Sequence, residues 1–306
     1  MPPRCSAACL AVLFVAAACT SEASEKVSDM GGHAIGAELM AQQAPQRGQQ
    51  QAPQQAPQQA PAMDRSMFDD PRGPYLQPEE LRATAGRFPF YWTRAAYSDG
   101  GGGGRFRRGG GSWSVDFPKS DQQFLIVIKR LMRLNAYDWE NPVALSDPQL
   151  RKYPLIYMLE VGRMYMTDAE VEGLRGYMEA GGFVIVDDFW GARAWDNFLW
   201  NMRRVFPDKT IVDIGLDHPV YSAYYQIEEV IQVPAFGNTV QLTECGGCYP
   251  QVKGMYDDDG RLMMMINFNT DLGDAWEWAE QPSYPLEFST YAYQMGANMI
   301  TYAMTH

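Results

Sequence analysis

Two adjacent carboxylates, Asp187 and Asp188, follow a four-residue apolar run, Phe183–Val186. A continuous apolar run of this length is typical of a strand that is covered on both faces. Carboxylates close to the dry end of such a strand need compensation from a cation, from backbone amides or from a helix dipole. Three interpretations stay open. One Asp caps the helix expected from about Ala192 while its partner fixes a loop, the pair binds a metal ion or polar ligand, or one Asp is a catalytic acid or base.

Glu160 and His218 are further candidates for a ligand-binding or acid/base role. Glu160 directly follows the apolar segment Leu155–Leu159, another predicted strand. Sites of parallel sheets lie beyond the carboxyl ends of the strands, so we expect Glu160 on the same rim as Asp187 and Asp188. His218, in an Asp-His-Pro sequence, is the only histidine in the interior of the predicted folded region. It can ligate a metal, act as a general base or hydrogen-bond a loop.

The segment 269–277 is dense in oxygen ligands and contains Asp271, Asp274 and Glu277. Its spaced acids resemble those of calcium loops, but the register of an EF-hand is incomplete. We expect either a structural or a functional loop. If it folds over the rim of the sheet, its acids join the Asp pair and His218 in one acidic pocket. A divalent metal is then the cofactor to consider, although no cofactor is assigned from the sequence.

The five cysteines divide into three near the start of the chain and a Cys-Gly-Gly-Cys pair, Cys245 and Cys248. In an oxidising compartment such a pair can form a small disulfide ring or exchange thiols. A thioredoxin-type site needs its first cysteine at a helix N-terminus, and Tyr249-Pro250 follows the pair here. A structural pair is therefore the preferred interpretation, and zinc lacks further ligands at suitable spacing.

The elements that must position these groups alternate between strand and helix. Thr167–Glu170 forms a capping box at the start of a predicted helix, Gly181-Gly182 ends it, and the apolar strand 183–186 follows. This rhythm predicts an α/β domain with a mostly parallel sheet flanked by helices. A small β-rich excursion is expected near 230–267, with a hairpin turn at Asp257–Gly260.

The start of the chain has the pattern of an export signal over residues 1–23, with one arginine, an apolar run and small residues near a cleavage site. The apolar run is too short for a permanent membrane span. Cys19 is a lipidation candidate, so a lipid-anchored and a soluble secreted form both stay open. Residues 24–86 contain Gln-Gln-Ala-Pro units typical of a disordered tether and a transition, and the α/β domain is expected over 87–306.

The composition of the chain limits the classes of partner that we expect it to bind. The formal net charge of -12 repels phosphate backbones and anionic lipid, so we expect no nucleic acid partner and membrane contact only through a lipid anchor. Hydrophobic residues make up 46% of the chain, which is enough for a sizeable core.

Six segments resemble, in order and spacing, the bacterial family called domain of unknown function 4159. They are YPLIYMLEVG, LRGYMEAGGFVIVDDFWG, DHPVY, DDDGRL, NTDLGDAWEW and YQMGANMITYAM. The resemblance covers about Arg87 to the C-terminus. It implies a flavodoxin-like fold similar to class I glutamine amidotransferases, and it implies no established reaction. In amidotransferases a nucleophile elbow with a cysteine stands where this chain has Asp187 and Asp188, so glutaminase activity is not expected.

Three functions follow as hypotheses. The first is an exported protein that binds a polar ligand or an envelope protein at the rim of the sheet. The second is a hydrolase, metal-assisted or acid/base, that acts on carbohydrate or envelope material with Asp188 and His218 in its site. The third is a tethered structural module of the envelope.

Overall fold

The computed structural model describes residues 89–100, 111–238 and 245–306, all of which belong to one compact unit, Pro61–His306. The predicted signal, the lipidation candidate Cys19 and the predicted tether fall within residues 1–88 and so lie outside the described residues. Across the part of the chain that is described, no helix is both long and apolar enough to cross a membrane.

The described residues form a seven-stranded sheet in the order β2-β1-β3-β4-β7-β6-β5. The strands are β1 (Thr93–Ala96), β2 (Asn141–Ala144), β3 (Leu155–Leu159), β4 (Phe183–Asp187), β5 (Ile211–Asp213), β6 (Gln251–Tyr256) and β7 (Leu262–Phe268). Five adjacent strands, from β2 to β7 in this order, are parallel, and β6 runs opposite to both of its neighbours. The predicted α/β class with a mostly parallel sheet is confirmed, whereas the flavodoxin-like assignment stays a prediction.

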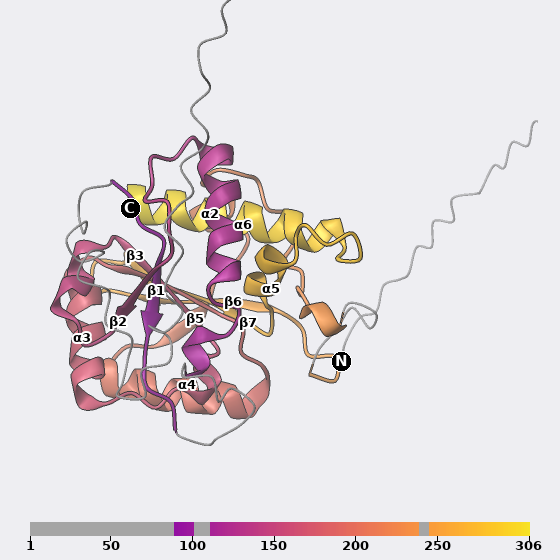
Figure 1. Ribbon diagram of the computed structural model, residues 1–306. Coiled ribbons are helices and arrows are strands. Elements are labelled where there is room, and N and C mark those ends of the chain that lie inside the picture. Colours follow the sequence, from indigo (N-terminus) through magenta and orange to yellow (C-terminus); the bar gives the residue numbers. More distant parts are fainter. Residues whose placement is uncertain (1–88, 101–110, 239–244) are drawn as a thin grey trace, which may run out of the picture. The chain divides into compact units, whose positions relative to one another are not determined.

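Helices cover both faces of this sheet (Figure 1). They are α2 (Lys119–Met132), α3 (Asp168–Glu179), α4 (Gly191–Val205), α5 (Leu272–Glu277) and α6 (Leu286–Thr305). Side chains alternate between the two faces along each strand. In β4, Val184 and Val186 join the core under α3 and α4, whereas Phe183 and Ile185 join the core under α2, α5 and α6.

Local sequence explains two of these boundaries. At the start of α3 the Thr167 side chain accepts a hydrogen bond from the Glu170 amide at 3.3 Å, and the Glu170 carboxylate accepts one from the Thr167 amide at 2.7 Å. The predicted capping box is therefore present. The turn at Asp257–Gly260 joins β6 and β7 as an antiparallel hairpin, as predicted.

The β-rich region is organised differently from the expected excursion. Its strands, β6 and β7, belong to the main sheet, and β7 pairs with β4 near the centre. Every residue of β7 is buried, because helices cover this strand on both faces. Within the described residues 230–238 there is no strand.

Candidate functional site

The rim at the carboxyl ends of β3, β4 and β7 has an unusual backbone. The residues that directly follow these strands, Glu160, Asp188 and Asn269, have φ angles of 51°, 49° and 60°. Asp and Asn tolerate this left-handed region better than other non-glycine residues, and such backbone clusters at functional sites. The loops are tied together, since the Glu160 amide donates to the Asp188 carbonyl at 3.0 Å and the Asp188 amide to the Thr270 carbonyl at 3.2 Å.

Asp187 is fully buried below this rim and holds the start of α5. Its Oδ2 accepts hydrogen bonds from the Tyr157 hydroxyl at 2.8 Å, the Leu272 amide at 2.9 Å and the Gly273 amide at 3.1 Å. Its Oδ1 is buried without a hydrogen-bond partner. Burial raises the pKa of Asp187 to about 7, against the opposing effect of the Tyr157 hydroxyl and the amides. Asp187 thus fixes a loop, as one interpretation of the pair expected.

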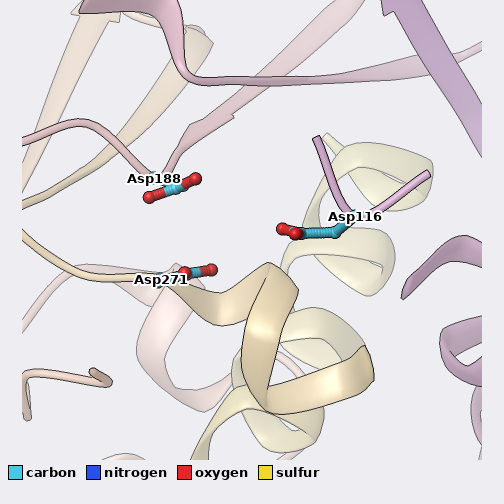
Figure 2. Close-up of side chains that lie close together, drawn as sticks. All are labelled: Asp116, Asp188 and Asp271. Atoms are coloured by element: carbon cyan, nitrogen blue, oxygen red, sulfur yellow. The ribbon is translucent and has the colours of Figure 1, made fainter. Parts of the chain in front are cut away.

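The other half of that interpretation is wrong. Helix α4 begins at Gly191, within one residue of the expected start, but its N-cap is Trp190 and no side chain caps it. The Gly191 amide instead donates to the Asn269 side chain at 2.9 Å. The Asp188 carboxylate lies instead beside Asp116 and Asp271 (Figure 2).

Asp188 is only 6% exposed. Its Oδ1 accepts a hydrogen bond from the Trp190 indole at 2.9 Å, and its second oxygen receives none from the described residues. Burial raises the pKa of Asp188 well above its usual range, and the negative charges of Glu160, Asp116 and Asp187 add to this. A mostly buried carboxylate among like charges, with a hydrogen bond from the described residues at one oxygen, is poorly compensated at neutral pH.

Asp116 and Asp271 complete a group of three carboxylates with Asp188. One ligand atom from each lies within 4.8 Å of the others, and Figure 2 shows the three carboxylates directed at one another. They come from three separate segments, namely the turn before α2, the loop after β4 and the N-cap of α5. Burial is the largest cause that raises the pKa of both Asp116 and Asp271, with neighbouring carboxylates second.

A second group overlaps the first. Asp116 also lies with Asp274 and Glu277, again with ligand atoms within 4.8 Å of one another. Burial and Asp274 raise the pKa of Glu277 to about 7, while Lys119, Asp116 and Arg94 oppose the rise. Asp271 of the predicted loop therefore lies in the Asp188 group itself, whereas Asp274 and Glu277 are linked to that group through Asp116, which the sequence analysis did not single out.

Arg94 positions Asp116 from below. This fully buried guanidinium pairs with Asp121, and it donates to the carbonyls of Trp113 and Val115 at 3.2 Å each. Both carbonyls precede Asp116 by at most three residues, so the bonds hold the turn that carries it. Asp116 itself has a left-handed backbone with φ of 59°. The sequence analysis did not single out Arg94, because arginine is rarely fully buried and its sequence neighbours give no sign of the distant Asp121.

His218 does not join this site. Its ring contacts Tyr302 and Tyr256, with centroids 5.4 and 6.2 Å away, and its Nδ1 accepts from the Val220 amide. Tyr302 packs on Phe183 at the amino end of β4. Five residues of strand separate Phe183 from Asp188, about 16 Å. The expectation that the acids and His218 share one pocket is therefore wrong, because His218 lies near the amino ends of the strands and the acids lie at the carboxyl ends. It hydrogen-bonds a loop.

Glu160 lies on the rim outside both groups of three, and the cysteine pair is tied to the rim by hydrogen bonds. Glu160 lies 3.5 Å from Arg163 in an ion pair and belongs to neither group of three. Cys245 and Cys248 form a disulfide. The Gln232 side chain donates to the Cys248 carbonyl at 2.6 Å and to the Asn269 carbonyl at 3.0 Å, which ties the disulfide loop to the rim.

The ligand atoms of the two groups are all carboxylate oxygens, which favour one class of metal ion. Carboxylate oxygens are the ligands of hard cations such as Mg²⁺, Mn²⁺ and Ca²⁺, and the two groups contain no sulfur or imidazole ligand. Three protein ligands leave coordination positions for water or for a bound molecule.

Comparison with known proteins identifies a family. No curated protein matches the chain significantly. Residues 104–304 of the 306, a range that includes all five acids of the two groups, match the family described as Domain of unknown function (DUF4159). The family recognised from the sequence is confirmed, and the chain belongs to it.

Proposed function

We propose that this protein is an exported, cation-dependent binding protein. A hard divalent cation is held by Asp116, Asp188 and Asp271, and its open coordination positions bind an oxygen-rich polar ligand. The observation that carries the proposal is the convergence of three carboxylates from separate segments, with ligand atoms within 4.8 Å, around an Asp188 oxygen that receives no hydrogen bond from the described residues.

Electrostatics support a cation at this position. At neutral pH the three carboxylates repel one another in a largely water-free place, which costs the folded protein free energy unless protons or a cation compensate. Arg94 cannot supply this compensation alone, because its charge is paired with Asp121. A divalent ion would neutralise two of the three charges and provide the missing partner of Asp188.

Export rests on the sequence pattern of residues 1–23, and a stalk-like placement on residues 24–86. With lipidated Cys19 the domain would be anchored to a membrane by its lipid, and without it the protein would be secreted. The hydrolase hypothesis paired Asp188 with His218, and the separation of these residues removes its acid/base partner. A hydrolytic reaction would have to use the acidic rim alone, so ligand binding is the better supported function.

The test is cation-dependent stability. EDTA-treated full-length protein is melted with Mg²⁺, Mn²⁺ or Ca²⁺, and binding is measured by calorimetry. A cation at one hundred times its Kd stabilises by about 2.7 kcal/mol. For a folded part of roughly 200 residues this raises Tm by about 5 to 10 °C.

Two variants locate the effect. Asp188→Asn should lose most of the shift, whereas Asp258→Asn should retain it, because the Asp258 side chain is fully exposed in the β6–β7 turn. If none of the three cations changes Tm or gives a binding heat, the proposal is wrong. Ligand binding at the rim without a cation and a tethered structural module would then be the functions left to test.

A further inference from the structure

Helix α5 presents a row of acids. Asp271 is its N-cap, Asp274 lies in its first turn and Glu277 is its last residue. Residues three apart are neighbours on the surface of a helix, so Asp274 lies between Asp271 and Glu277. The row is anchored at both ends of the first turn, since Asp271 Oδ1 accepts from the Asp274 amide at 2.8 Å and the Asp274 carboxylate from the Phe236 amide at 2.6 Å.

Asp116 faces this row and belongs to both groups of three. Its Oδ2 is buried without a hydrogen-bond partner. A carboxylate has two oxygens, each with lone pairs, and can therefore ligate two cations at once. Asp188 and Asp271 are its neighbours in the first group, and Asp274 and Glu277 are its neighbours in the second.

Charge balance favours two cations over one. The two groups together contain five carboxylates, namely Asp116, Asp188, Asp271, Asp274 and Glu277. One divalent ion would leave three negative charges uncompensated in a mostly buried place. Two would leave one, and Lys119 supplies a nearby positive charge that acts on Glu277.

We propose that Asp116 bridges two divalent cations, the first bound with Asp188 and Asp271 and the second with Asp274 and Glu277. This inference rests on the proposed function for its first cation and adds the second position. Carboxylate-bridged pairs of this kind hold their ions about 3.5 to 4 Å apart. Lys119 lies beside the second position, with its ammonium 3.7 Å from the centre of the Trp278 ring.

The experiment counts cations and tests whether they are close. EDTA-treated full-length protein is titrated with Mn²⁺ and followed by calorimetry, by metal analysis after desalting and by electron paramagnetic resonance. We expect two Mn²⁺ per wild-type chain and a spin-coupled spectrum. Glu277→Gln should bind one Mn²⁺ with an uncoupled spectrum, because it loses a ligand of the second position only. Affinity at that position should fall at least about tenfold.

The controls separate the two proposals. Asp258→Asn should behave as wild type. If Glu277→Gln melts too low to use, Asp274→Asn replaces it and should likewise bind one Mn²⁺ with an uncoupled spectrum. One uncoupled Mn²⁺ in both wild type and Glu277→Gln would overturn the second position and leave the proposed function standing. Two Mn²⁺ in Glu277→Gln would overturn the assignment of Glu277. No binding in wild type would overturn both proposals.

Discussion

Replacing Asp187 with Asn should flatten the pH dependence of stability in metal-free protein. The carboxyl of Asp187 is fully buried, and folding raises its pKa from an ordinary 3.8 to about 7. The folded state therefore binds the proton more tightly than the unfolded chain does. The stabilisation from this proton is fully present below the unfolded pKa and is lost as pH rises through the folded one.

The magnitude follows from the two pKa values. Each pH unit between them changes the free energy of unfolding by about 1.4 kcal/mol, so ionised Asp187 costs the folded state about 4 kcal/mol in total. About 3 kcal/mol of this accumulates between about pH 5 and about pH 8. An Asn at this position cannot ionise, yet its amide oxygen can still accept from Tyr157, Leu272 and Gly273.

The assay is urea unfolding in EDTA at several pH values, for wild type, Asp187→Asn and the exposed control Asp258→Asn. As pH rises across this window, the free energy of unfolding of Asp187→Asn should increase by about 3 kcal/mol relative to that of wild type, whichever of the two proteins is the more stable at the acid end. The other raised carboxyls are present in all three proteins and largely cancel in this comparison. Parallel curves for Asp187→Asn and wild type would refute the reasoning, because they would show that Asp187 titrates alike in both states.

Three further predictions concern the elements that support the site. Arg94→Lys should lower the free energy of unfolding by about 3 kcal/mol and weaken cation binding, because it leaves Asp121 poorly paired and frees the turn that carries Asp116. Urea unfolding measures the first effect and a Mn²⁺ titration the second. An unchanged Mn²⁺ affinity would contradict the positioning role of Arg94. Thr167→Ala should cost about 1 kcal/mol by thermal unfolding without altering cation affinity, since it removes only the capping box of α3. Cation affinity should fall as pH is lowered, because raised carboxyl pKa values make protons compete with the ion; calorimetry that gives the same Kd at about pH 5.5 and about pH 7.5 would count against the proposed site.

Several elements of the fold can be predicted from local sequence. The segment Leu155–Leu159 was predicted as a strand with the bounds that β3 has, and the capping box at Thr167 marks the start of α3. These features depend on side-chain periodicity and on hydrogen bonds between near neighbours, which a sequence exposes directly. The parallel arrangement then places Glu160, Asp187 and Asp188 together at the carboxyl ends of the strands.

The membership of the site was decided by tertiary structure. Asp116 stands in an irregular turn whose backbone is left-handed, and its place beside Asp188 depends on the buried Arg94 and on the docking of α5. None of these contacts has a periodic signature, because they join segments far apart in the chain. His218 was misplaced for the same reason. Sequence shows which residues end a strand or cap a helix, whereas packing decides which loops meet and which lie at opposite ends of the strands.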